Sequence, residues 1–186
     1  MRLNKILKNA LLVISAGIIL TACATKKEVA VETPAAKEET KKEETKKEEV
    51  TKIEKIAGQM QGDVYVGTDS VKYLADGVAD RVFFATNESI LTTASRETLR
   101  AQAAWLRANS NITVVLEGHA DERGTREYNL ALGERRANSA KDYLMTYGVS
   151  SDRITVISYG KERPVDSGSN PLAWSKNRRS VTVKAN

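Results

Sequence analysis

From residue 80 to its C-terminal end, the sequence alternates between two kinds of hydrophobic pattern. The strand-like runs are RVFFAT, NITVVLEGH, DRITVISYG and RRSVTVKA. They are rich in β-branched or aromatic residues, which favour extended, half-buried backbone. Two long segments between them, residues 92–110 and 126–148, carry apolar residues at helical spacing. We therefore expect an α/β domain, an α+β sandwich in the order β-α-β-α-β-β, with about four strands and two long helices on one face.

Each expected helix has a defined apolar side. In the first helix, Leu99, Ala103 and Leu106 recur at spacings of three and four residues. In the second, the apolar positions are Leu130, Ala137, Ala140 and Leu144. Gly148 is a natural C-terminal stop for this helix. The loop before the last strand is expected to hold one helical turn near Ala173.

The first 22 residues form a different unit. Arg2, Lys5 and Lys8 precede the uncharged run ALLVISAGIIL, and small residues follow it, which is the order of a secretory signal peptide. The run is shorter than the about 20 residues that a membrane-spanning helix needs. The end of the segment, LTAC, resembles the lipobox of bacterial lipoproteins, which implies cleavage before Cys23 and acylation of that residue. Ala24, in place of Asp, implies sorting to the outer membrane. The alternative is an ordinary signal peptide or short anchor helix in which Cys23 has no role.

A charged segment separates this signal from the expected domain. Residues 23–57 contain the repeat EETKKEETKKEEV and no aromatic residue. Such a chain cannot bury enough apolar surface to offset the entropy of ordering it, so we expect a solvated tether. Residues 58–79 are interpreted as a transitional arm with one short strand or extended backbone, to which we assign no chemistry. The globular domain is expected over residues 80–186.

The basic balance of the chain raises the question of an anionic partner. The formal net charge is +5, but aromatic residues make up only 5% of the chain and are not interleaved with the basic ones. Proteins that bind single-stranded nucleic acids stack bases on aromatic side chains within a basic groove. We therefore expect no nucleic-acid partner.

The densest polar cluster is EGHADERGTREYNLALGERRAN, residues 117–138. His119 is the only histidine, and a catalytic histidine needs an oriented nucleophile or substrate. The chain contains no G-x-S-x-G or H-E-x-x-H motif, and one His without a second Cys argues against zinc. We expect no cofactor, no metal and no catalysed reaction. We interpret His119 as a strand-end residue that holds the next loop by hydrogen bonds, and Gly118 and Gly124 as allowances for the turn.

Together with ISYGKERPV and NRRSV, this cluster resembles the OmpA-like peptidoglycan-binding domain over about residues 80–184. The resemblance implies noncovalent binding of the meso-diaminopimelate in the peptidoglycan stem peptide. It places Asp121 against the ammonium of this ligand and Arg136 against its carboxylate, which a guanidinium can hold with two hydrogen bonds. From the residues alone, Asp121 could instead be a turn cap and Arg136 a surface ion pair. Arg135 points about 100° away on the helix and is expected in a surface salt bridge.

The resemblance also implies secondary contacts with the ligand. The residues concerned are Asn129, Leu132, Asn87, Thr86 and Arg123. Asn129 and Leu132 lie near the start of the second helix, whereas Thr86 and Asn87 lie in the loop after the first strand, whose backbone is expected to bind the ligand. Arg123 either contacts the ligand or pairs with Glu122. In the NRRSV motif, Arg178 or Arg179 either flanks the pocket or binds acidic groups of the fold.

The lipobox and the resemblance together imply a lipoprotein of the outer membrane whose domain faces the periplasm and grips the cell wall. The expected partners are peptidoglycan, the outer membrane and the Tol system, with TolB as the direct protein partner in envelope integrity and cell division. One alternative is a wall hydrolase or amidase acting through His119, Asp121 and Glu122. Another is a protein-binding module with a weakened wall pocket, which is favoured only by Ala85, where relatives often carry an acidic residue or Gly.

Overall fold

The computed structural model describes residues 58–185. The expected signal peptide, the acylated Cys23 and the tether therefore lie outside the described residues. Within them, no helix is both long enough and apolar enough to cross a membrane.

A four-stranded mixed sheet organises the described residues. Its strands are β5 (Arg81–Phe83), β6 (Val114–His119), β7 (Ile154–Gly160) and β8 (Arg179–Lys184). They are ordered β5-β8-β6-β7, so that β8, the last strand of the chain, lies between β5 and β6. β8 is antiparallel to both of its neighbours, whereas β6 and β7 are parallel and need a helical crossover.

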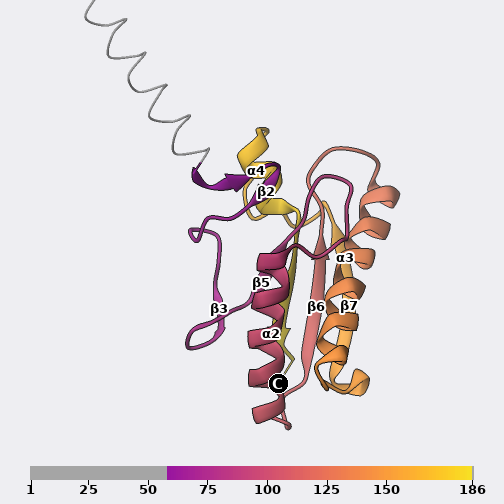
Figure 1. Ribbon diagram of the computed structural model, residues 1–186. Helices are drawn as coiled ribbons and strands as arrows, with labels where there is room; N and C mark the ends of the chain where they lie inside the picture. The colour runs from indigo at the N-terminus through magenta and orange to yellow at the C-terminus, as the bar shows by residue number, and fades with distance from the viewer. Residues whose placement is uncertain (1–57, 186) are drawn as a thin grey trace, which may run out of the picture. The chain divides into compact units, whose positions relative to one another are not determined.

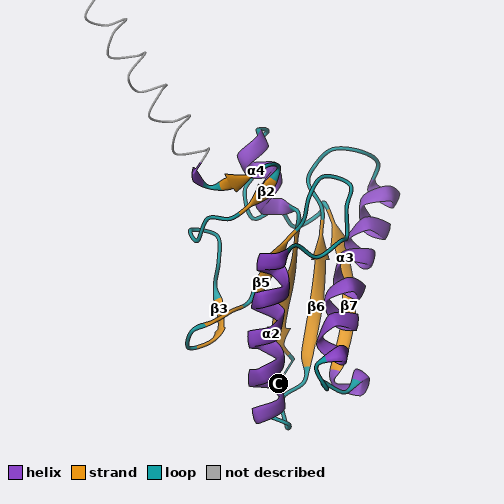
Figure 2. Cartoon of the chain, in the orientation of Figure 1, coloured by secondary structure: helices purple, strands orange, loops and turns teal. Residues whose placement is uncertain are grey.

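Two long helices, α2 (Thr93–Ala108) and α3 (Arg126–Thr146), lie side by side on one face of this sheet (Figures 1 and 2). Each begins at a threonine whose hydroxyl accepts a backbone N–H of the first turn, at Thr92 and Thr125. Gly148, with φ of 84°, follows the end of α3. The short helix α4 (Pro171–Asn177) is the helical turn expected near Ala173. These elements confirm the predicted fold class and the predicted order of helices and strands along the chain.

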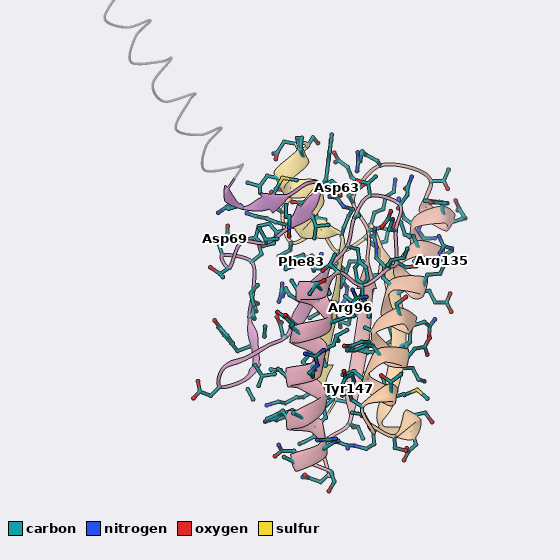
Figure 3. The ribbon with its side chains drawn as sticks, viewed as in Figure 1. Asp63, Asp69, Phe83, Arg96, Arg135 and Tyr147 are labelled. Carbon is teal, nitrogen blue, oxygen red and sulfur yellow. The ribbon has the colours of Figure 1, made fainter. Side chains whose placement is uncertain are left out.

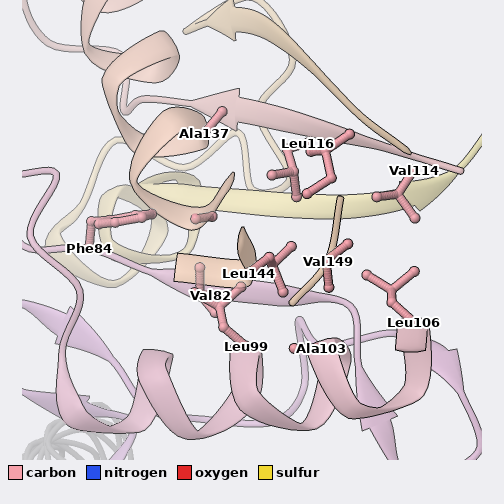
Figure 4. Close-up of a cluster of buried hydrophobic side chains, with 12 residues drawn as sticks. Val82, Phe84, Leu99, Ala103, Leu106, Val114, Leu116, Ala137, Leu144 and Val149 are labelled. Atoms are coloured by element: carbon pink, nitrogen blue, oxygen red, sulfur yellow. The ribbon is translucent and has the colours of Figure 1, made fainter. Parts of the chain in front are cut away.

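The core lies between the two helices and the sheet. On α2, the predicted face of Leu99, Ala103 and Leu106 is at most 1% exposed. It packs against buried side chains of α3 and of the strands (Figure 4). The partners include Ala137, Ala140, Leu144, Val82 and Leu116. Leu130 is only half-buried, because it lies at the edge of the α3 apolar face.

The arm before the domain is more structured than expected. It forms two antiparallel hairpins, β1 (Met60–Gln61) with β2 (Val64–Tyr65) and β3 (Tyr73–Ala75) with β4 (Val78–Ala79). The arm is packed onto the sheet, since the Tyr65 ring is 2% exposed and meets the Phe83 ring edge-on at 4.7 Å.

A glycine pair allows α3 to approach β6 closely. A Cβ atom at Gly118 would lie 1.8 Å from the carbonyl oxygen of Gly133, and one at Gly133 would lie 2.9 Å from the carbonyl oxygen of Gly118. The interpretation of Gly118 as a turn residue is therefore wrong, since it lies within β6 and is required for helix–strand contact. Gly124, with φ of 88°, does have the left-handed backbone of a turn.

Candidate functional site

A cavity of about 330 Å³ lies between the loop after β5, the loop after β6 and the first half of α3. Its lining contains all seven residues that the resemblance implied as ligand contacts, together with Gly124 and Tyr128. The seven are Thr86, Asn87, Asp121, Arg123, Asn129, Leu132 and Arg136. On α3, positions 129, 132 and 136 are separated by three and four residues, so they share one helix face.

Arg136 is fully buried and donates to three backbone carbonyls, two in the loop after β5 and one at the end of β6. Its Nε donates to Glu88 O at 2.8 Å, Nη1 to His119 O at 2.9 Å and Nη2 to Ala85 O at 3.0 Å. Burial, reinforced by the nearby Arg178 and opposed by Asp121, lowers the pKa of Arg136 to about 10, so it remains a cation at neutral pH. The Arg136 guanidinium therefore holds the backbone of the cavity wall together and also gives the cavity a positive charge.

Asp121 is the buried acid of the cavity and is held by two arginines. Arg123 donates from Nε to Oδ1 at 3.1 Å and from Nη2 to Oδ2 at 2.7 Å, and the Arg123 backbone N–H also reaches Oδ1. Arg178 Nη1 donates to Oδ2 at 3.3 Å. Burial by itself would raise the pKa of Asp121, but these hydrogen bonds and charges lower it on balance. Asp121 is thus a carboxylate at neutral pH.

The two arginines around Asp121 differ in their exposure to solvent. The Arg178 side chain is 3% exposed and also donates to the backbone carbonyls of Phe84 and Asp63. The Arg123 side chain is 43% exposed and lies over the Trp174 ring, with 4.3 Å from Cζ to the ring centroid. Arg123 forms its ion pair with Asp121 and not with Glu122, whose Oε1 accepts from Trp174 Nε1. Of the two arginines left open in NRRSV, Arg178 is the one beside the pocket acid.

The loop after β5 presents its backbone in a defined conformation. Asn87 has φ of 58°, and Asn tolerates this left-handed region better than most non-glycine residues. The Thr86 N–H is not available to a ligand, because it donates to Asp63 Oδ2 at 2.6 Å. Ala85 contributes its carbonyl to Arg136, so the small side chain at this position leaves that contact intact.

The remaining lining residues close the cavity on the α3 side. Asn129 is 2% exposed and its Nδ2 donates to Arg123 O at 2.7 Å, which fixes the turn after β6. Leu132 is 3% exposed and supplies an apolar surface. Tyr128, which sequence reasoning missed, precedes Leu132 by one helical turn, and this spacing was its available signal.

The three groups of the enzyme alternative do not line one cavity. The His119 side chain lines a different cavity, and neither ring nitrogen has a hydrogen-bond partner among the described residues. The predicted hydrogen bonding of His119 at the strand end is therefore made by its carbonyl, which accepts from Arg136, and not by its imidazole. Arg135 is exposed on α3 (Figure 3), where its guanidinium lies 5.9 Å from the Tyr128 ring centroid. It makes no ion pair with any described residue, contrary to the expected salt bridge.

The arrangement pairs a buried carboxylate with a buried guanidinium across one small cavity. Groups of opposite charge that are fixed apart are the complement of a ligand that carries both an ammonium and a carboxylate. Among the described residues, no group of three or more His, Cys, Asp and Glu side chains could hold a metal ion.

The OmpA family matches residues 83–178 of the chain. The peptidoglycan-associated lipoprotein of Mesorhizobium japonicum is 53% identical over 106 residues, which are 57% of this chain and 63% of that protein. The chain thus spans less than two thirds of the length of this relative. The protein of the same name from Pasteurella multocida is 40% identical over 70% of this chain and 83% of its own length.

Solved structures agree on the fold. The peptidoglycan-associated lipoprotein of Burkholderia pseudomallei superposes with a TM-score of 0.55 at 33% identity, covering 56% of this chain and 89% of that chain. The C-terminal domain of Helicobacter pylori MotB gives a TM-score of 0.54 at 17% identity, covering 57% and 84%, and at this identity shows the fold alone.

Proposed function

The chain belongs to the OmpA family, and on that premise we propose that it binds peptidoglycan through the cavity between the β5 and β6 loops and α3. The ligand is the meso-diaminopimelate of the stem peptide, and no covalent bond is made or broken. The observation that carries this proposal is the pair Asp121 and Arg136, a buried anion and a buried cation lining the same cavity. The relatives named peptidoglycan-associated lipoproteins support peptidoglycan as the binding partner.

Arg136 is suited to the ligand carboxylate. A guanidinium has five N–H groups, and among the described residues each of the three nitrogens of Arg136 donates to one carbonyl. One N–H on each Nη is therefore left for a ligand oxygen. Because the three carbonyl contacts already fix the guanidinium, little side-chain entropy is lost when the ligand binds.

Asp121 is suited to the ligand ammonium, provided that Arg123 moves. Both carboxylate oxygens already accept two hydrogen bonds each. We propose that the ammonium replaces the half-exposed Arg123 guanidinium on Asp121, while the buried Arg178 stays in place. The exchange leaves no unpaired charge on the buried Asp121, because the ligand ammonium takes the place of the departing cation and the Arg123 side chain is 43% exposed to solvent. The Arg123 guanidinium already lies over the Trp174 ring, and we propose that it keeps this ring contact when it leaves Asp121.

Retention of the purified protein on isolated cell-wall sacculi tests the site. Asp121→Asn and Arg136→Lys remove a charge or a planar fork with little change of volume. Each should weaken retention by about tenfold or more, as expected for hydrogen bonds to charged groups. Asp142→Asn and Arg135→Lys make the same changes at exposed positions of α3 and should bind normally.

The results also separate the alternatives. Free meso-diaminopimelate should compete with the sacculi, and Arg123→Gln should lose less binding than Asp121→Asn, because Arg123 gives way to the ligand. If the Asp121 and Arg136 variants are folded by circular dichroism and are retained as strongly as the wild type, the proposed site is contradicted. Release of soluble wall fragments would instead favour an enzyme.

We further propose that acyl chains on Cys23 anchor the protein in the outer membrane, with residues 23–57 as the tether and the domain in the periplasm. TolB and other Tol components are the proposed protein partners. The LTAC motif and the resemblance to lipid-anchored relatives support these statements.

A further inference from the structure

A second cavity, of about 610 Å³, lies against the face of the sheet that turns away from the helices. Arg81 pairs with Val181, which pairs in turn with Glu117, and cross-strand partners share a face. The alternate residues Val82 and Leu116 point into the core beneath the helices. Residues 72–74 of the arm and 163–165 after β7 complete the lining. No residue lines both this cavity and the one around Asp121.

The charges around this cavity are mainly positive. The cationic lining residues are Lys72, Arg81, Arg163, Arg179 and Lys184. The acidic lining residues are Asp80 and Glu117. Arg81 holds Asp80 with two hydrogen bonds of 2.7 Å, which neutralises both groups. Lys184 Nζ lies 4.9 Å from the Trp105 ring centroid of α2 and is therefore turned away from the cavity. Lys72, Arg163 and Arg179 still outnumber Glu117, so the cavity keeps a positive excess.

Buried donors in this cavity lack partners. His119 is 2% exposed, and neither Nδ1 nor Nε2 has a hydrogen-bond partner among residues 58–185. Arg179 is 6% exposed, and its Nε likewise has no partner there. The Nη1 and Nη2 atoms of Arg179 donate to the carbonyls of Asn177 and Arg163, so the guanidinium is held in position. Because buried polar groups in folded proteins are almost always hydrogen-bonded, these atoms point to a missing partner.

We propose that this cavity binds a small oxyanion, a phosphate or carboxylate group, with His119 and Arg179 as direct donors. The fixed guanidinium of Arg179 presents its Nε–H to an oxygen, and a neutral imidazole supplies one further N–H. Arg163 adds positive charge from the rim, where its guanidinium lies over the Tyr159 ring at 3.8 Å from the ring centroid. The Tyr159 ring also stacks on His119, with 5.6 Å between centroids, and so fixes the imidazole.

The electrostatics favour an anion over a cation. Burial, and then the charges of Arg179, Arg81 and Arg163, lower the pKa of His119 to about 3. The imidazole is therefore neutral at physiological pH, and the contact of 3.7 Å between its Nε2 and Glu117 Oε2 is not an ion pair. The arginine charges that disfavour an imidazolium also disfavour a bound cation and attract an anion.

The single histidine of the chain allows a direct test in the intact protein. The imidazole resonances of His119 are unambiguous in an NMR spectrum, and they are followed while sodium phosphate, or separately sodium acetate, replaces chloride at constant ionic strength. We expect a saturable shift of these resonances. Saturation by phosphate alone would assign the site to phosphate groups, and saturation by both would assign it to oxyanions including carboxylates.

Two variants and a control tie the shift to this cavity. Arg163→Gln removes an exposed charge at the rim and should weaken the binding of the anion by roughly two- to fivefold. Arg179→Lys keeps the charge but removes the Nε donor, and should weaken the binding of the anion by about tenfold. Arg135→Gln removes an exposed charge outside the cavity and should change nothing. A shift that never saturates, or equal affinities in wild type and Arg163→Gln, would overturn the proposal. Retention on sacculi tests the cavity around Asp121 separately, so failure of one proposal can be told from failure of the other.

Discussion

At the scale of the residue, His119 shows how one position can serve two sites. Its carbonyl oxygen accepts from Arg136 Nη1 at 2.9 Å and so helps to build the cavity around Asp121. Its imidazole lines the opposite cavity, where burial and three arginines hold its pKa at about 3. The sequence motif marks His119 as a strand-end residue, but it does not reveal which atoms of the residue are used.

The lowered pKa of His119 predicts a specific pH dependence of stability. Below pH 6.5, the ordinary pKa of histidine, the imidazole of the unfolded chain binds a proton. In the folded protein the imidazole stays neutral until the pH falls to about 3. Stability from this group is therefore complete above pH 6.5 and falls as pH decreases towards 3, with a slope of up to about 1.4 kcal/mol per pH unit. Urea unfolding between pH 7 and pH 4 should show a flatter decline for His119→Phe. Parallel curves for the two proteins would argue against a depressed pKa.

At the scale of the element, α3 connects the core to the cavity around Asp121. One of its faces packs Ala137, Ala140 and Leu144 into the core, while Asn129 and Arg136 line the cavity. The helix can serve both purposes because it lies directly on β6, with the backbones of Gly118 and Gly133 in contact. A wider separation would lengthen the contact of 2.9 Å between Arg136 Nη1 and His119 O.

Substitution of Gly118 by alanine should therefore be severely destabilising. The new Cβ would lie 1.8 Å from a backbone carbonyl, which cannot move aside as a flexible side chain could. We expect a loss of about 3 kcal/mol or more in the free energy of unfolding. Gly58→Ala is the matched control, because a Cβ there has no neighbour within 4 Å. Similar denaturant midpoints for the two variants would contradict this account of the helix–strand contact.

At the scale of the whole described molecule, the arm is joined to the ligand cavity. Asp63 lies in the β1–β2 hairpin (Figure 3), and its carboxylate accepts the N–H of Thr86, which is 23 residues away in the chain. The Asp63 carbonyl accepts from Arg178, which also donates to Asp121. Burial by itself would raise the pKa of Asp63, but the Thr86 hydrogen bond and Arg178 lower it. The arm thus supports both a cavity loop and the cavity acid.

Loss of the Asp63 carboxylate should release the cavity loop without unfolding the protein. In Asp63→Ala, we expect the Thr86 amide to exchange its hydrogen about tenfold faster, the lower end for a hydrogen bond to a charged group. Hydrogen exchange followed by NMR measures this directly. Asp76→Ala removes an exposed acid in the β3–β4 turn and is expected to leave the Thr86 amide unchanged. Equal protection in both variants would show that the arm does not hold the loop.

For residues 80–185, the sequence by itself determined the main helices and strands, their order and most of the buried faces of the two long helices, but it did not reveal the two hairpins of the arm. These properties depend on local periodicity, which decides whether a segment is helical and which side of it is apolar. The same helical geometry showed that only one of Arg135 and Arg136 can face the cavity, and the family resemblance selected Arg136, which is the buried one. The motif from residue 117 to 138 then named residues that line one cavity in the structure.

Only the tertiary structure decided which partners these residues meet. The position of β8 between β5 and β6, the contact between Gly118 and Gly133, and the pairing of Arg123 with Asp121 are not encoded in any local pattern. The hydrogen bond from Arg178 to the Asp63 carbonyl joins residues that are 115 positions apart in the chain. The cavity beside His119 forms only where the arm meets the sheet. A periodic pattern shows which face of an element is buried, but the identity of the opposing surface depends on how distant segments pack together.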